Sequence, residues 1–175
     1  MKLVGKLFIM VWFVLAAVGA VNAQTMNAKD EAAIKRVVLA VGQALNDHDI
    51  KAYSEQFWDD ADWINVMGMH WRGKANVVAA HEAYMSTVFH NGGYTYSDLI
   101  VNQAAANVAV VVKTEHTIEQ TSPSGFKIPA GDDRLSFVVV KRNGKWKVLH
   151  GHNTPVDARA KPFDPIESHW RPKSQ

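Results

Sequence analysis

The chain has 175 residues, 19 of them Lys or Arg and 17 Asp or Glu, and it contains no cysteine. The absence of cysteine excludes a disulfide framework, a thiol nucleophile and a cysteine metal site. The sequence contains no stripe of Lys or Arg residues of the kind that would indicate nucleic-acid binding. The composition therefore predicts one globular domain without thiol chemistry and without nucleic acid as a partner.

The first 23 residues have the pattern of a secretory signal peptide. Lys2 and Lys6 form a basic start, and an apolar run of 12 residues follows from Leu7 to Val18. Small residues at Val21-Asn22-Ala23 then offer a cleavage point before Gln24. We expect residues 1–23 to be removed and the protein to be periplasmic or secreted, with no membrane association afterwards. The alternative is an uncleaved N-terminal anchor.

Two helices are expected next. Asn27 is a suitable N-cap, and apolar residues recur at three and four positions, which predicts a helix over Asn27–Asn46. Its apolar stripe consists of Ile34, Val37, Val38, Val41 and Leu45. Asp49 can cap a second, shorter helix that buries Ile50, Tyr53 and Phe57.

A short strand with Trp63 and Asn65 on one face follows and closes at Gly68. An aromatic ring beside an amide suits the wall of a small pocket better than an ordinary core. A third helix is expected over roughly Ala75 to Phe89, with His81 at the centre of its apolar face.

From Tyr94 onward the apolar residues follow period two, which predicts strands. The expected strands are Tyr94–Val101, Val108–Glu119, Arg134–Arg142 and Lys145–His152, the last two joined by a hairpin turn at Asn143-Gly144. On the long strand, one face carries Val108, Val110, Val112, Thr114, His116 and Ile118. The opposite face, with Lys113, Glu115, Thr117 and Glu119, has a solvated pattern. On the final strand Trp146, Val148, His150 and His152 are expected to share a face.

Helices first and antiparallel strands afterwards indicate an α+β fold, with a strongly bent antiparallel sheet wrapped around the N-terminal helices. Such an arrangement leaves an internal cavity, the usual kind of small-ligand site. We expect the domain to span residues 24–156. Residues 157–175 form a Pro-containing C-terminal tail that holds no long regular element.

The chain also resembles a known family. The residues that resemble the start of a SnoaL-like domain, in the nuclear-transport-factor-2-like superfamily of cone-shaped folds, are Ala44-Leu45-Asn46, Asp49, Phe57, Asp59-Asp60-Ala61 and Gly68. Those that resemble the SgcJ/EcaC family are Trp63, Asn65, Gly68, Arg72-Gly73, His81, Phe89, Arg134 and the ending His152-Asn153-Thr154-Pro155-Val156. The resemblance covers about Ala28 to Val156 and implies the cone fold. Its members include isomerases, cyclases, dehydratases and non-catalytic binding modules, so the fold alone does not fix the function.

The resemblance permits a direct comparison with ketosteroid isomerase, which needs a carboxylate base and acids that stabilise an enolate. The base of that enzyme falls on Asn65, which has no useful basicity, and its oxyanion-stabilising tyrosine falls on Val41. Asp133 is a weaker match, across loops, for the second oxyanion acid. Steroid isomerisation of that design is therefore not expected.

The candidate catalytic residues are His81 and His116, each on an apolar face that could look into the cavity and shuttle protons. The candidate ligand-binding residues are Trp63, Asn65, Tyr84, Phe89, Arg134 and Asn153. The alternatives are that each histidine is a hydrogen-bonded wall residue and that Arg134 makes a structural ion pair with Asp60, Asp62 or Asp132.

No metal site and no cofactor are expected. His150 and His152 could supply two ligands to a metal, but no carboxylate stands at a telling spacing for a third. No nucleotide fingerprint, phosphate loop or flavin motif is found.

The favoured function is a secreted small-molecule-binding protein. It is either a cofactor-independent isomerase, cyclase or dehydratase that acts on a partly apolar organic substrate, or a non-catalytic binding or oligomerisation module. A homodimer is expected from the resemblance, although Lys113, Glu115 and Thr117 would argue against a purely apolar interface.

Overall fold

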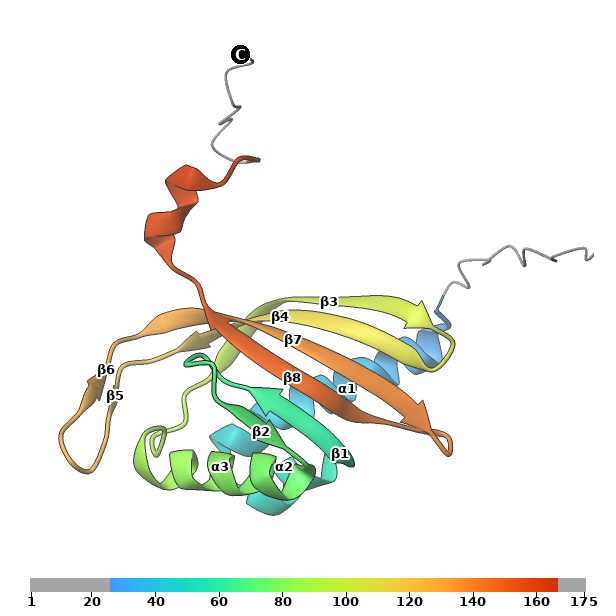
Figure 1. Ribbon diagram of the computed structural model, residues 1–175, viewed down its shortest axis with the longest axis horizontal. Coiled ribbons are helices and arrows are strands. Elements are labelled where there is room, and N and C mark those ends of the chain that lie inside the picture. Colours follow the sequence, from blue (N-terminus) through green and yellow to red (C-terminus); the bar gives the residue numbers. More distant parts are fainter. Residues whose placement is uncertain (1–25, 167–175) are drawn as a thin grey trace, which may run out of the picture.

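A six-stranded sheet with helices on one side organises the molecule (Figure 1). The computed structural model describes residues 26–166, so the predicted signal peptide lies outside the described residues. The strands are ordered β2-β1-β8-β7-β4-β3, and every neighbouring pair is antiparallel except β1 with β8. The strands of the sheet are β1 (Phe57–Ile64), β2 (His70–Arg72), β3 (Thr95–Ala105), β4 (Val108–Thr117), β7 (Gly131–Arg142) and β8 (Lys145–Pro155). The α+β class with a curved sheet is thus confirmed, with one parallel pair that the sequence did not predict.

The first two helices begin at the expected caps. The side chain of Asn27 accepts the N–H of Asp30 at the start of α1 (Ala28–Asn46), and Asp49 accepts the N–H of Ala52 at the start of α2 (Ile50–Glu55). The apolar stripe of α1 lies in the core, with Ile34, Val38 and Val41 buried. Phe57 differs from the prediction, because α2 ends at Glu55 and Phe57 opens β1.

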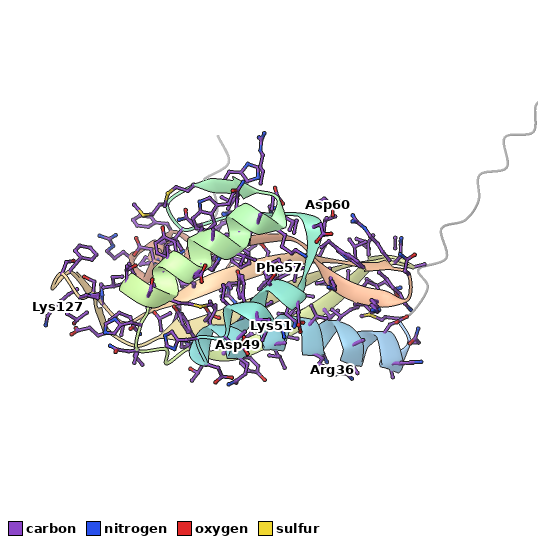
Figure 2. The ribbon with its side chains drawn as sticks, turned by 90° about the horizontal axis from the view of Figure 1, so that it is seen from below. Arg36, Asp49, Lys51, Phe57, Asp60 and Lys127 are labelled. Carbon is purple, nitrogen blue, oxygen red and sulfur yellow. The ribbon has the colours of Figure 1, made fainter. Side chains whose placement is uncertain are left out.

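The third helix, α3 (Lys74–Thr87), lies across the concave side of the sheet beside β1 (Figure 1). Gly73 precedes it with a φ of 80°, a left-handed conformation that glycine adopts without strain. Val77 and Met85 anchor the helix in the core. The side-chain view in Figure 2 shows all three helices covering the same face of the sheet. Among residues 26–166 no helix is long and apolar enough to cross a membrane.

The long strand β4 faces the opposite way from the prediction. Ala109, Val111, Lys113 and Glu115 are buried on the concave face, whereas Val110, Val112 and His116 are only half-buried on the convex face. The prediction failed because both faces of this strand carry apolar residues in its first half. The alternation of residue types therefore does not indicate which face is buried. The expectation that Lys113 and Glu115 are solvated is therefore wrong.

The last strand changes phase in the middle. Val138 pairs with His150 and Val139 with Val148, so Leu149 is an extra residue that forms a β-bulge. Trp146 and Val148 point into the core before the bulge, and Gly151 and Asn153 point inward after it. His150 and His152 consequently lie on the convex face, which corrects the prediction that they share the face of Trp146 and Val148.

The predicted hairpin at Asn143-Gly144 joins β7 to β8, with φ values of 50° and 75°. The segment between β4 and β7 holds a small hairpin of β5 (Gln120–Thr121) and β6 (Lys127–Ile128). Figure 2 shows Lys127 at the far end of the molecule, where this hairpin projects beyond the sheet. The described part of the tail forms one 3₁₀ helix, η1 (Ala158–Phe163), and leaves from the convex side (Figure 1).

Candidate functional site

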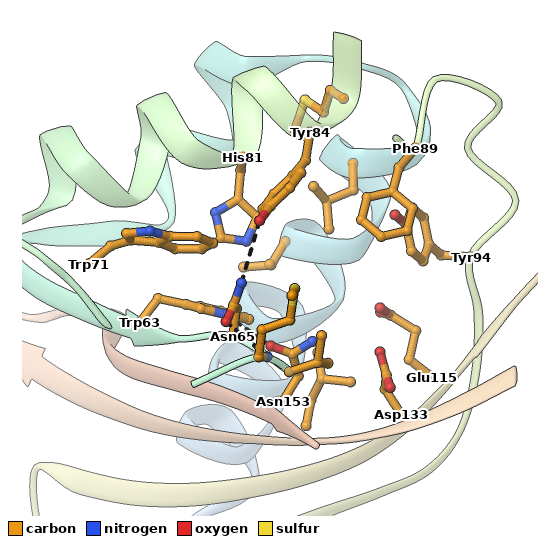
Figure 3. A pocket seen from close by; sticks show the side chains of 16 residues that line it. Trp63, Asn65, Trp71, His81, Tyr84, Phe89, Tyr94, Glu115, Asp133 and Asn153 are labelled. Atoms are coloured by element: carbon orange, nitrogen blue, oxygen red, sulfur yellow. Dashed lines mark hydrogen bonds between the residues drawn. The ribbon is translucent and has the colours of Figure 1, made fainter. Parts of the chain in front are cut away.

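A pocket of about 150 Å³ lies between α3 and the concave face of the sheet (Figure 3). Its ring-bearing residues are Trp63, Trp71, His81, Tyr84, Phe89 and Tyr94. Its other polar residues are Asn65, Glu115, Asp133 and Asn153. Its aliphatic residues are Val41, Leu45, Val66, Met67, Met85 and Leu135. An apolar cavity of roughly this volume can hold a molecule such as benzene, so the pocket suits a small cyclic compound.

The rings form one continuous wall. Trp63 and Trp71 contact His81 edge-on, with centroids 5.0 and 5.4 Å from the imidazole. The wall continues from Tyr84 to Phe89 at 6.1 Å and from Phe89 to Tyr94 at 5.7 Å. These separations are typical of favourable aromatic contacts, which hold the rings in place without a ligand.

His81 presents a hydrogen-bond acceptor rather than a charge. Its Nδ1 lies 2.8 Å from the carbonyl oxygen of Val77, which can only accept, so Nδ1 carries the proton and Nε2 has a free lone pair. Burial lowers the pKa of His81 to about 4, although the bond to Val77 opposes this shift. The imidazole is therefore neutral at ordinary pH and a weak proton acceptor.

Asn65 lines the pocket, but its oxygen is committed to a turn. Its Oδ1 accepts the backbone N–H groups of Met67 at 3.0 Å and Met69 at 2.9 Å, which fixes the connection to β2. Only the amide N–H₂ remains for the pocket, where it lies 3.5 Å from the hydroxyl of Tyr84. Asn65 can therefore donate a hydrogen bond to a ligand but cannot accept a proton.

A short relay orients Asp133 in the floor of the pocket. The indole of Trp63 donates to Oδ1 of Asn153 at 3.1 Å, so the amide nitrogen of Asn153 is left to donate to the Asp133 carboxylate. Gly151 makes the relay possible, because a Cβ there would lie 2.2 Å from the Trp63 ring. Burial raises the pKa of Asp133, and the negative charges of Glu115 and Asp132 raise it further.

Glu115 lies beside Asp133 and belongs to a buried ion pair. Its Oε2 lies 2.6 Å from the ammonium nitrogen of Lys113, and the two side chains are only 6% and 2% exposed. Lys113 points away from the pocket, toward a groove between α1 and β3 that Glu115 and Tyr94 also line. Burial raises the pKa of Tyr94, and the nearby carboxylates of Glu115 and Asp133 raise it further.

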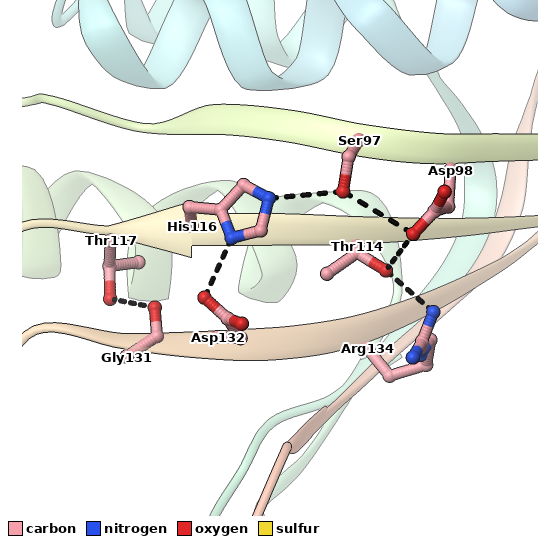
Figure 4. A network of polar contacts seen from close by, with 8 residues as sticks. All are labelled: Ser97, Asp98, Thr114, His116, Thr117, Gly131, Asp132 and Arg134. Carbon is pink, nitrogen blue, oxygen red and sulfur yellow. Dashed lines mark hydrogen bonds and ion pairs between the residues drawn. The ribbon is translucent and has the colours of Figure 1, made fainter.

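His116 and Arg134 lie outside the pocket. Both are on the convex face of the sheet, in a polar network that Figure 4 shows. His116 bonds Asp132 through Nδ1 at 2.6 Å and Ser97 through Nε2 at 3.0 Å. Arg134 donates to the hydroxyl of Thr114 at 2.5 Å. The structure therefore does not bring these two predicted site residues together with His81.

The order Ser97–His116–Asp132 has the connectivity of a nucleophile, a base and an orienting acid. The network lies on an open strand face, however, and the backbone N–H groups of β4 beside it pair with carbonyl oxygens of β3 and β7 across the ladders. Those groups are not free to form an oxyanion hole, without which such a triad lacks its main source of transition-state stabilisation. We assign the network to the surface of the sheet.

The two late histidines also lie on the convex face. His150 bonds Asp62 at 2.7 Å, and the other oxygen of Asp62 bonds His70 at 2.5 Å. Within residues 26–166 no group of three or more His, Asp or Glu side chains is placed to hold a metal ion.

Sequence reasoning missed four of the ring-bearing and polar residues of the pocket, which are Trp71, Tyr94, Glu115 and Asp133. Trp71 and Tyr94 follow a turn and a loop, where the periodic pattern does not predict orientation. Glu115 was assigned to the wrong face, and Asp133 entered only as a weak match to a family position. One signal was available for Asp133, because Leu135 and Phe137 share its face and their size indicates the core.

Comparisons with known proteins agree with this fold. A model of the SnoaL-like domain matches residues 34–157. An uncharacterised protein with a cystatin-like fold from Caulobacter vibrioides is 34% identical, with a TM-score of 0.74 over 79% of this chain and 97% of that one. No curated protein matches significantly.

More distant structures share only the fold. A ketosteroid isomerase-like protein from Erwinia carotovora atroseptica is 19% identical, with a TM-score of 0.63 over 75% of this chain and 99% of that one. A hexachlorocyclohexane dehydrochlorinase is 14% identical, with a TM-score of 0.65 over 74% of this chain and 90% of that one.

Proposed function

Because the chain belongs to the SnoaL-like domain family, we propose that it binds a small, partly apolar organic molecule in the pocket between α3 and the sheet. The observation that carries this proposal is the pocket itself, with a continuous aromatic wall on one side and oriented polar groups on the other. Preformed apolar cavities with a few convergent polar groups are the usual form of ligand sites.

If the protein is an enzyme, its chemistry is a cofactor-independent proton transfer of the isomerase, cyclase or dehydratase type. Asp133 is the best-placed proton carrier, since a raised pKa brings a carboxyl group closer to neutral pH. His81 would accept a hydrogen bond through Nε2 rather than act as a strong base. Relatives of the same fold named for isomerase and dehydrochlorinase activity are consistent with this class.

The alternative is a carrier or sensor that binds without turnover. Asn65 favours this alternative over steroid isomerisation, because an amide stands where the resemblance places the catalytic carboxylate and its oxygen is held by the turn. Assignment to the SgcJ/EcaC family is part of the proposal, as are cleavage of residues 1–23 and a periplasmic or secreted location.

We also propose a homodimer that uses the convex sheet face. Val110, Val112 and Ile100 lie on that face and are half-buried or exposed, which gives an apolar strip beside the His116 network. Lys113 and Glu115, which would have opposed such an interface, lie on the concave face instead.

Blocking the mouth of the pocket tests the binding function. Val66 lines the pocket and is 42% exposed, so Val66→Trp can cover the mouth without overpacking the core. Val156 is 44% exposed and does not line the pocket, so Val156→Trp is a matched control. Calorimetric titration with small cyclic alcohols, ketones and amines should give binding in the natural protein and the control and at least tenfold weaker binding in Val66→Trp. Equal binding in all three proteins would refute the pocket as the site.

A further inference from the structure

The charges around the pocket are of one sign. Among the residues that line it in the described part of the chain, Glu115 and Asp133 are acidic and none is Lys or Arg. Lys113 neutralises part of the Glu115 charge but from the groove behind it, and His81 is neutral because burial lowers its pKa. One end of the pocket therefore has a negative potential.

The two carboxylates have hydrogen-bonding capacity that the protein does not fill. Glu115 uses Oε2 for Lys113, and no hydrogen bond from residues 26–166 reaches its Oε1, although the side chain is only 6% exposed. Asp133 receives the Asn153 amide, and an ionised carboxylate has room for several donors. Carboxylate oxygens that face a pocket with unused acceptor capacity favour a ligand that brings hydrogen-bond donors.

Aromatic rings stand opposite these carboxylates. In Figure 3 the rings of Phe89 and Tyr94 lie across the cavity from Glu115 and Asp133. Tyr94 and Glu115 line both this pocket and the groove behind it, so the two side chains lie at the same end of the pocket. Ring faces attract cations through their quadrupole, and aromatic cages with a nearby acid recognise ammonium groups.

We propose that the ligand of this pocket carries a positive charge, as a protonated amine or a quaternary ammonium group, held between the two carboxylates and the two rings. The rest of the molecule is a small apolar or cyclic body that packs between Trp63 and Tyr84. This inference rests on the proposed binding function and adds the chemical class of the ligand.

Other ligand classes fit the site less well. An anion would face two carboxylates without a cationic side chain among the lining residues, and like charges in a shielded site repel strongly. A neutral alcohol could donate one hydrogen bond to a carboxylate but, without a charge of its own, would gain neither attraction between opposite charges nor attraction to the rings. A neutral carbonyl compound would require Asp133 to be protonated.

Three probes of similar size separate these classes. Benzylamine is protonated at pH 7.5, benzyl alcohol is neutral, and benzoate is negatively charged. Calorimetric titration at pH 7.5 should show benzylamine binding at least about tenfold tighter than benzyl alcohol, with benzoate weakest. Equal binding of benzylamine and benzyl alcohol, or tighter binding of benzoate, would overturn the cation assignment and leave the binding function standing. Binding of none of the three would count against both proposals.

A pair of adjacent variants locates the effect. Asp133→Asn keeps the shape of the floor and removes one charge, and it should weaken benzylamine about tenfold or more while leaving benzyl alcohol within about twofold. Asp132→Asn is the matched control, because that neighbouring side chain bonds His116 on the convex face. A cooperative thermal unfolding transition in both variants is the control that each of them folds. The same loss in both variants, or no loss in Asp133→Asn, would reject the assignment.

Discussion

At the scale of single residues, His81 shows how its surroundings decide which chemistry a side chain can perform. Its ring is packed against Tyr53, Trp63 and Trp71, with the nearest centroid at 4.7 Å. Burial among these side chains removes water from the imidazole and disfavours its charged form, so the pKa falls to about 4. The residue predicted as a proton shuttle is thus better described as a neutral acceptor in the wall of the pocket.

The depressed pKa of His81 predicts a loss of stability in mild acid. Between pH 6.5 and about 4 the unfolded chain binds a proton at this position that the folded chain does not, so the free energy of unfolding falls as the pH falls. His81→Asn cannot titrate, and its amide can still donate to the Val77 carbonyl. From pH 7 to pH 4.5 the natural protein should lose about 2 kcal/mol more than this variant in urea unfolding.

The comparison of the two proteins isolates His81 from other titrating groups. Asp133 acts in the opposite direction, because a raised pKa stabilises the folded state as the pH falls, but it is present in both proteins. An equal pH dependence of the two unfolding free energies would show that His81 is not buried as a neutral ring.

At the scale of elements, β4 shows what the sequence could and could not predict. Its existence and approximate length follow from the period-two pattern, but its orientation does not, because Val110 and Val112 are as apolar as Ala109 and Val111. Lys113 and Glu115 looked solvated because charged residues usually are. They lie inside because the two charges neutralise each other. Hydropathy is assigned to single residues and therefore does not record such a pair.

The buried pair predicts an unusual response to mutation. Glu115→Gln leaves the Lys113 ammonium buried without a counter-charge and should lower the free energy of unfolding by about 3–5 kcal/mol. The double variant Lys113→Met/Glu115→Leu removes both charges and should recover most of that loss, since an apolar replacement of a buried pair is often neutral. Urea unfolding of both variants provides the measurement.

An exposed pair supplies the control. Lys35 and Glu31 lie one turn apart on α1 with side chains 43% and 41% exposed, so Glu31→Gln should change the free energy of unfolding by less than about 1 kcal/mol. If Glu115→Gln were no more destabilising than Glu31→Gln, the pair would have to be accessible to water.

The β-bulge in β8 could not be predicted from the sequence, for a different reason. An extra residue at Leu149 reverses the alternation, so a correct assignment of Trp146 and Val148 leads to a wrong one for His150 and His152. No Gly or Pro marks the position. Asn153, which was named as a ligand-binding candidate at the end of the final strand, lies after the bulge and lines the pocket.

At the scale of the whole molecule, the fold was predictable and the site only in part. The order of helices and strands indicated the class, and the family resemblance indicated the cone shape that a model of the SnoaL-like domain supports. The candidate residues that line the pocket are Trp63, Asn65, His81, Tyr84, Phe89 and Asn153. The acidic end of the pocket forms because Glu115 on β4 pairs with Asp133 on β7. The sequence of neither strand alone predicts this pairing.

The central claim is that ligands bind in this pocket, and the indole N–H signals of an ¹⁵N-labelled protein test it most directly. Trp63 and Trp71 line the pocket, whereas Trp58 donates to the Val140 carbonyl and Trp146 to Asp30, away from it. On titration with benzylamine or benzyl alcohol, the signals of Trp63 and Trp71 should shift with saturation while those of Trp58 and Trp146 stay in place. Saturating shifts confined to Trp58 or Trp146 would contradict the assignment of the site.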